Sequence, residues 1–179
     1  MKSLKTKQLL WLAGAAASLF ILNNIMLGFI IPRLPGGSST GISSMFVLTL
    51  ISLYFKRFGN IPIIYLFYGL FGLISHLLAG DSMYLLAILF LVLSALVYDL
   101  LLYFGKYHVL ANLYALPVFI VIENIAMQVL GYIGSGHWNF PKMDGFLMNL
   151  VYGFAGIGIA FIVHRIFERK KKIKLAGNI

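Results

Sequence analysis

The sequence predicts an all-α integral membrane protein, one domain with six transmembrane helices and both termini in the cytoplasm. Hydrophobic residues make up 61% of the chain and charged residues 11%, whereas soluble domains average about 45–50% and about 25%. The 179 residues hold six apolar runs joined by short connections. Because a span needs roughly 20 residues, six spans leave no room for a soluble domain beside them.

Short polar or basic turns separate the expected spans. The second apolar run is the shortest, with 14 residues, which would cover about 21 Å as a helix. This helix must therefore be little tilted, extend into the preceding loop, or be shielded by protein. We expect the six spans at residues 9–31, 42–55, 61–79, 83–104, 111–133 and 145–167, within one domain of residues 1–179.

Basic residues mark one side of the predicted bundle. Twelve of the 14 lysines and arginines fall in the N-terminal segment, the turns around Lys56 and Lys106, and the C-terminal tail. Only Arg33 and Lys142 fall on the other side. The positive-inside rule therefore places both termini in the cytoplasm. The formal charge of +9 reflects this topology, and no basic patch with interleaved aromatic residues indicates a nucleic acid partner.

The fifth expected span carries a carboxylate, Glu123, in the middle of an apolar run. An ionisable group inside a spanning helix costs at least ~2.5 kcal/mol, so it normally faces a cavity or a partner. Asn124 and Gln128 follow at helical spacing, on a stripe about 100° from Glu123. We expect this helix to line a polar site. The alternative is that Glu123 only hydrogen-bonds a neighbouring helix.

Polar residues gather in the outer half of the predicted topology. The inner half is apolar apart from Asp99, Asn112 and basic residues, and we expect Asp99 to pair with Lys106, Arg57 or His108 at the interface. The outer residues predict a pocket, open to the outside, that captures a small solute. The candidate binding residues are Asn23, Asn24, His76, Glu123, Asn124, Gln128, His137, Trp138, Asn139 and Asn149.

An irregular loop rich in glycine, serine and proline joins the first two spans at residues 32–41. A loop of this length and composition is typical of a lid or a site-lining segment, although a solvated connector has the same composition. Trp138 also has an alternative role, since tryptophan is enriched at the membrane interface.

The chain contains no known metal-binding or nucleotide-binding signature. The absence of cysteine excludes disulfides, thiolate metal sites and cysteine nucleophiles. HExxH, Walker A and CxxC motifs are absent, and the four histidines lie on different elements. We therefore expect no catalytic residue, metal or cofactor. Two alternatives stay open: a small membrane enzyme that uses Glu123 with His76 or His137, and a structural membrane subunit.

The first span contains six consecutive small residues, and within them Ala13 and Ala17 form a small-xxx-small pair. Such pairs let another helix approach closely, either in a partner or in the same chain. Together with the six spans, the glycine- and proline-rich outer loop and the Gly59-Asn60-Ile61-Pro62 sequence, this pattern resembles the substrate-binding S components of energy-coupling factor (ECF) transporters.

The resemblance implies a multi-pass protein of the prokaryotic plasma membrane that binds a vitamin-like solute with high affinity near the outer face. It also implies three partner subunits: a transmembrane coupling subunit that contacts Ala13 and Ala17, and two ATPase subunits. The S component itself hydrolyses no ATP. The residues match no particular vitamin subtype, but their aromatic and amide content favours a partly aromatic solute.

Overall fold

The computed structural model describes residues 6–23, 38–78, 83–137 and 143–176. Within these residues every regular element is a helix, as the sequence predicts. Three segments are long and apolar enough to cross a membrane, at residues 84–104, 109–135 and 146–170. The helices are α1 (Thr6–Ile21), α2 (Ser38–Phe55), α3 (Asn60–Leu78), α4 (Tyr84–Phe104), α5 (Val109–Ser135) and α6 (Met143–Ala176).

The helix ends differ from the predicted spans in three places. α1 continues through one π-helical turn to residue 23, and residues 24–31 of the predicted first span lie outside the described residues. α2 begins at Ser38, so the last four residues of the predicted outer loop are helical, because serine and threonine are favoured at helix starts. α6 runs to Ala176, well beyond residue 167, because lysine and arginine are good helix formers.

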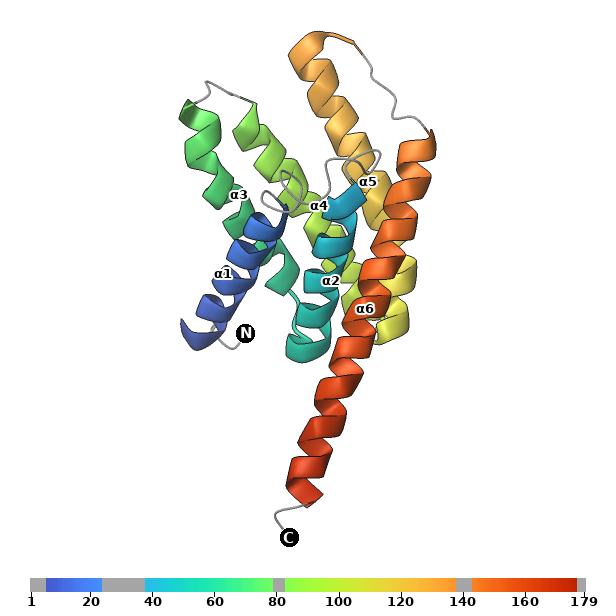
Figure 1. Ribbon diagram of the computed structural model, residues 1–179. Helices are drawn as coiled ribbons and strands as arrows, with labels where there is room; N and C mark the ends of the chain where they lie inside the picture. Colours follow the sequence, from blue (N-terminus) through green and yellow to red (C-terminus); the bar gives the residue numbers. More distant parts are fainter. Residues whose placement is uncertain (1–5, 24–37, 79–82, 138–142, 177–179) are drawn as a thin grey trace.

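The six helices are arranged in a ring (Figure 1). α1 packs on α3, α3 on α4, α4 on α5, α5 on α6 and α6 on α2, and smaller contacts of α2 with α1 and α3 close the ring. α1 begins and α6 ends at the same end of the bundle, which we call the inner end; the opposite end is the outer end.

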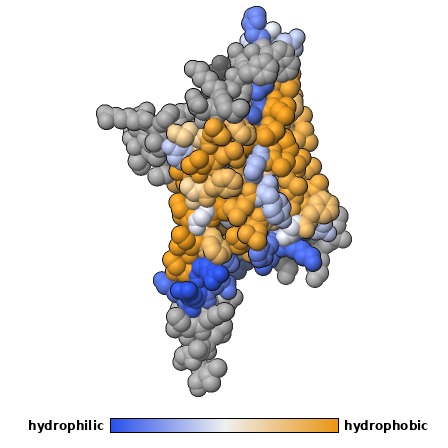
Figure 2. Space-filling view, turned by 90° about the vertical axis from the view of Figure 1, so that its right-hand side faces the viewer, coloured by the Kyte–Doolittle hydropathy of each residue, from blue (hydrophilic) through white to orange (hydrophobic). Residues whose placement is uncertain are grey.

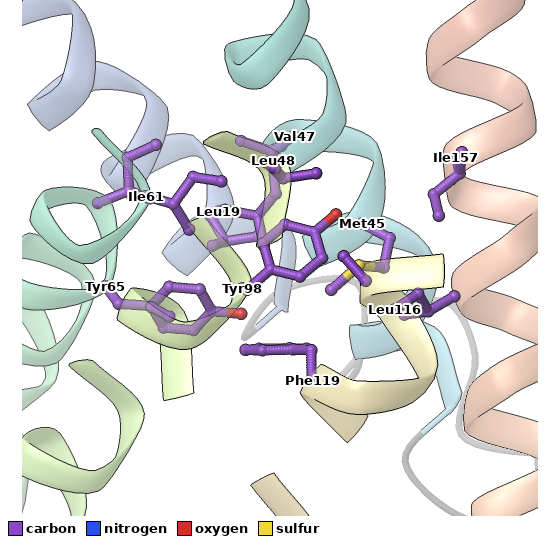
Figure 3. Packing of buried hydrophobic residues seen from close by; sticks show 14 of the residues in the cluster. Leu19, Met45, Val47, Leu48, Ile61, Tyr65, Tyr98, Leu116, Phe119 and Ile157 are labelled. Atoms are coloured by element: carbon purple, nitrogen blue, oxygen red, sulfur yellow. The ribbon is translucent and has the colours of Figure 1, made fainter. Parts of the chain in front are cut away.

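Small residues allow the helices to approach each other in the apolar core. Ala16 of α1, Ala95 of α4 and Ala115 of α5 are all fully buried. On α1 the buried face consists of Leu12, Ala16 and Leu19, which lie at the i, i+4 and i+7 positions of one helix face. Larger side chains fill the space between the helices, and Figure 3 shows several of them.

The outer surface of the bundle is also apolar. α4 exposes a row of leucines along its length, and Figure 2 shows a hydrophobic band over the body of the molecule with hydrophilic residues gathered toward its ends. Soluble monomers rarely expose apolar patches larger than a few hundred Å². The surface is therefore that of a membrane protein. The exposed leucines of α4 are Leu85, Leu89, Leu93, Leu96 and Leu100.

Gly156 brings α6 against the backbone of α2. A Cβ atom at this position would overlap the carbonyl oxygen of Ile42 and lie 3.1 Å from the Cβ of Met45. A Cβ at Gly158, two residues later, would meet nothing within 4 Å. These two glycines are therefore a matched pair for testing the α2–α6 contact.

We predict that Gly156→Ala lowers the free energy of unfolding by about 1–3 kcal/mol, the usual cost of adding a group to a packed interior. Gly158→Ala should leave stability unchanged or raise it slightly, because alanine favours the helix. Thermal unfolding of both variants in one detergent measures the difference. Equal unfolding temperatures would show that α2 and α6 do not depend on this close approach.

Candidate functional site

A cavity of about 420 Å³ lies in the outer half of the bundle. Its position follows from its lining, which includes the end of α1, the start of α2 and the start of α6, together with the middle of α3 and α5. The volume falls in the range of about 300–1,000 Å³ that is typical of small-molecule sites. The lining residues with polar side chains are Asn23, Ser44, Tyr65, Tyr68, Glu123, Asn124 and Asn149.

Glu123 is the acidic residue of this lining. It is partly buried on α5 and contributes to the cavity wall. Within the described part of the chain, no hydrogen bond or ion pair reaches its carboxylate. The phenol of Tyr65 lies within electrostatic range. Glu123 therefore lines the cavity together with Tyr65, and no described side chain of a neighbouring helix hydrogen-bonds its carboxylate.

Asn124 lies beside Glu123 and turns its amide group toward its own helix. Its Nδ2 donates a hydrogen bond of 2.8 Å to the carbonyl oxygen of Ile120. This bond uses one of the two amide N–H groups of Asn124, which leaves its second N–H and its side-chain oxygen for other partners. Gln128 follows one turn later and is half-buried, but it does not line the cavity. Of the predicted polar stripe, Asn124 therefore lines the cavity and Gln128 does not.

Asn23 joins three helices at the edge of the cavity. Its side chain is 5% exposed, and its Nδ2 lies 3.5 Å from both the Ser44 Oγ and the Tyr68 Oη. Its Oδ1 accepts a hydrogen bond from the Ser43 hydroxyl. The amide of Asn23 is thus occupied by contacts that hold α1, α2 and α3 together where the cavity begins.

Aromatic rings form a continuous wall on the α3 and α5 side of the cavity. The ring centroids of Tyr65 and Tyr68 are 6.3 Å apart, and those of Tyr65 and Phe119 are 6.0 Å apart. Phe119 in turn lies 5.2 Å from Tyr98 in the core (Figure 3). These distances fall within the range at which tilted aromatic pairs attract. The rings therefore pack against one another along this side of the cavity.

A buried polar layer lies in the core beside these rings. The Tyr98 hydroxyl donates a hydrogen bond of 2.8 Å to the Asn112 Oδ1, and the Ser52 Oγ lies 3.4 Å from the same atom. Thr49 and Asn112 are fully buried. None of these four residues lines the cavity. The layer separates the outer cavity from the inner end of the bundle.

The structure brings four of the ten predicted binding residues to one cavity: Asn23, Glu123, Asn124 and Asn149. Gln128 is close but does not line it, and His137 is exposed beyond the end of α5. The remaining four cannot be located at the site. Asn24, Trp138 and Asn139 lie outside the described residues, and His76 belongs to α3 but its side chain is not among those described.

The structure separates His137 from Glu123. Ser135, the last residue of α5, is twelve positions after Glu123 in the sequence, which corresponds to about 18 Å along a helix. His137 lies beyond it, where its backbone N–H donates to the Ser135 Oγ at 3.3 Å. The described residues therefore do not form the pair that an enzyme based on Glu123 and His137 would need.

Sequence reasoning missed the hydroxyl and aromatic part of the lining. Ser44, Tyr65, Tyr68 and Phe119 all line the cavity, yet each lies within an apolar run. The available signal was the spacing of Tyr65 and Tyr68, which places two phenols on one face of α3. Phe119 carries no polar atom, so its contribution to the site depends on packing alone.

Asp99 lies outside the cavity, as predicted, but it has partners other than the expected ones. Its carboxylate is fully buried and accepts hydrogen bonds from the Gly59 backbone N–H at 2.6 Å and from the Tyr107 hydroxyl at 3.2 Å. Burial and the adjacent Asp99 charge raise the pKa of the Tyr107 phenol, so the phenol remains a donor. His108, one of the expected partners, instead accepts a hydrogen bond from the Leu110 backbone N–H and caps α5.

The Asp99 contacts connect the turn before α3 with the turn before α5. We predict that Asp99→Leu destabilises the bundle by about 1–3 kcal/mol for each donor left unpaired. Tyr107→Phe removes one hydrogen bond and leaves the Gly59 contact in place, so its loss should be smaller. Thermal unfolding in detergent measures both. If Tyr107→Phe is as harmful as Asp99→Leu, the Gly59 contact contributes nothing.

A functional assignment for this chain rests on the geometry of its cavity. No protein-family model, curated protein or solved structure matches the chain. The cavity, its single carboxylate and its aromatic wall must therefore indicate what the protein does.

Proposed function

We propose that this chain is a high-affinity, membrane-embedded binding subunit for the uptake of a vitamin-like small solute, working with an ATP-driven ECF core. The observation that carries the proposal is the outer cavity of about 420 Å³, in which Glu123 and Asn124 face an aromatic wall. A mostly apolar cavity with a few convergent polar groups is typical of small-molecule binding.

In this proposal all six helices cross the plasma membrane of a prokaryotic cell, with the inner end of the bundle in the cytoplasm. The turns and helix end on that side carry Lys56, Arg57, Lys106 and Arg165, and basic residues are enriched on the cytoplasmic side of membrane proteins. The cavity then opens toward the outside, where a scarce solute must be captured before transport.

The outward face of α1 is the proposed contact with the coupling subunit. α1 packs mainly on α3, and its Leu10 and Trp11 are among the most exposed apolar residues of the chain, at 69% and 63%. Ala13 and Ala17 lie beside this face and are half-buried, and a Cβ at Gly14 would meet nothing within 4 Å. Small residues at such a position permit the close approach of a partner helix.

Native mass spectrometry of the gently purified protein tests solute binding. We expect a copurified small molecule on the wild-type protein and its loss in Glu123→Leu, which removes the carboxylate from the cavity wall. Glu168→Leu, on α6 away from the cavity, is the matched control and should keep the molecule. A wild-type protein that carries no molecule and binds none from a vitamin panel would support a structural subunit instead.

A second prediction concerns the partner contact. Ala13→Trp and Ala17→Trp should abolish copurification with the coupling and ATPase subunits while solute binding persists, because an indole on this face prevents close helix approach. Leu89→Trp, on the exposed face of α4, should leave the complex intact. Full recovery of the complex with both alanine variants would assign these residues to packing within the chain.

A further inference from the structure

We infer that the solute of the outer cavity is an organic cation with its positive charge next to a flat ring. This inference rests on the proposed binding function and adds the chemical class of the ligand. Three features of the lining support it. They are the lack of a described protein partner for the Glu123 carboxylate, the hydrogen-bonding groups left free in the cavity, and the aromatic wall.

Asp99 and Glu123, the two carboxylates within the helix bundle, differ in their partners. Asp99 receives a backbone N–H and a phenol from the protein itself, whereas Glu123 receives no hydrogen bond or ion pair from the described residues. The described lining of the cavity also contains no lysine, arginine or histidine. A carboxylate away from water is costly unless a cation or donor pairs with it. A positively charged ligand would therefore provide the partner that the described residues do not give to Glu123.

The amides beside Glu123 also favour a donor-bearing ligand. Asn124 uses its Nδ2 on the Ile120 carbonyl, and Asn23 uses its Nδ2 on Ser44 and Tyr68. What Asn124 leaves for a ligand is its carbonyl oxygen, which is an acceptor, and one N–H of its amide. The Glu123 carboxylate and the Asn124 oxygen can both accept hydrogen bonds from an ammonium or a protonated ring nitrogen, and the carboxylate repels an anionic group.

The aromatic wall also favours a positively charged ligand that contains a ring. Tyr65, Tyr68 and Phe119 line the same cavity as Glu123, and their rings pack against one another. Ring faces attract cations through their quadrupole, and they also stack on the ring of a ligand. The cavity volume of about 420 Å³ is toward the lower end of the range for ligand sites, which favours a small aromatic cation.

A metal cation fits this lining less well. The described residues contain no group of three or more histidine, cysteine, aspartate and glutamate side chains that could hold a metal ion. The cavity offers one carboxylate and otherwise amides, hydroxyls and apolar surface. An organic cation uses that apolar surface, whereas a metal ion does not.

Three probes of nearly the same shape test the charge preference: 1-methylnicotinamide, a cation; nicotinamide, which is neutral; and nicotinate, an anion. Their equilibrium binding to the purified full chain in detergent can be measured by calorimetry at neutral pH. We expect the cation to bind at least about tenfold more tightly than nicotinamide, because its quaternary ring nitrogen, which has no N–H, is attracted by the charge of the carboxylate and by the aromatic rings. Nicotinate should bind most weakly.

Variants of the wall assign the preference to Glu123. Glu123→Gln keeps the shape of the side chain and should remove the advantage of the cation, whereas the matched change Glu168→Gln should leave it intact. Asn124→Asp adds a second carboxylate to the same wall and should strengthen cation binding. This second variant keeps the inference testable if Glu123→Gln does not fold.

The possible results distinguish a wrong ligand class from a wrong binding function. If nicotinamide or nicotinate binds as tightly as the cation, or if the cation keeps its advantage in Glu123→Gln, the inferred charge is wrong while the binding function stands. If none of the three probes binds and the purified protein carries no small molecule, the proposed binding function fails and the inference fails with it.

Discussion

The helices of this protein are apolar both toward the core of the bundle and on its outer surface, and this constrains how they pack. When the outside of a bundle is as apolar as its core, burial of apolar area does little to hold helices together, and close contact at small residues becomes decisive. Ala16, Ala95 and Ala115 are fully buried where helices meet. Gly156 brings α6 onto the backbone of α2. The ring of six helices, and the cavity inside it, depend on these contacts.

The same surroundings make every buried polar group informative. Three groups of such residues follow the axis of the bundle from the inner to the outer end. Asp99 is satisfied by Gly59 and Tyr107, and Asn112 accepts from Tyr98. No described residue pairs with the Glu123 carboxylate, and it differs from the Asn112 Nδ2, which is also unpaired, because a cavity lies beside it. The first two groups connect elements within the protein, whereas the third is the group that the proposed function assigns to a ligand.

The apolar and aromatic parts of the site matter as much as the charge. A carboxylate alone would bind any cation weakly from water, whereas a carboxylate beside Tyr65, Tyr68 and Phe119 can select for shape and ring character as well. The contacts of Asn23 with α2 and α3 hold the edge of the cavity in place. In the proposed function, ligand recognition and helix packing therefore meet at the outer end of the bundle.

Helix existence was predictable from sequence because long apolar runs leave few alternatives. The fourth and fifth helices match their predicted spans within two residues at each end. The ends of α2 and α6 were not predictable in this way, because Ser38 and the basic C-terminal segment are polar but helix-compatible. Hydropathy detects where a chain enters an apolar environment, and a helix does not have to end there.

By itself, the sequence determined the all-helical membrane class, the position of the anomalous carboxylate Glu123 and its amide neighbour Asn124. These follow from composition and from spacing within one helix, which are local properties of the chain. Tertiary structure decided that Asn23 and Asn149 reach the same cavity, that Gln128 does not, and that Tyr65, Tyr68 and Phe119 complete its wall. The reason is geometric: helix periodicity relates residues on one helix, but which faces of different helices meet depends on the packing of the whole ring.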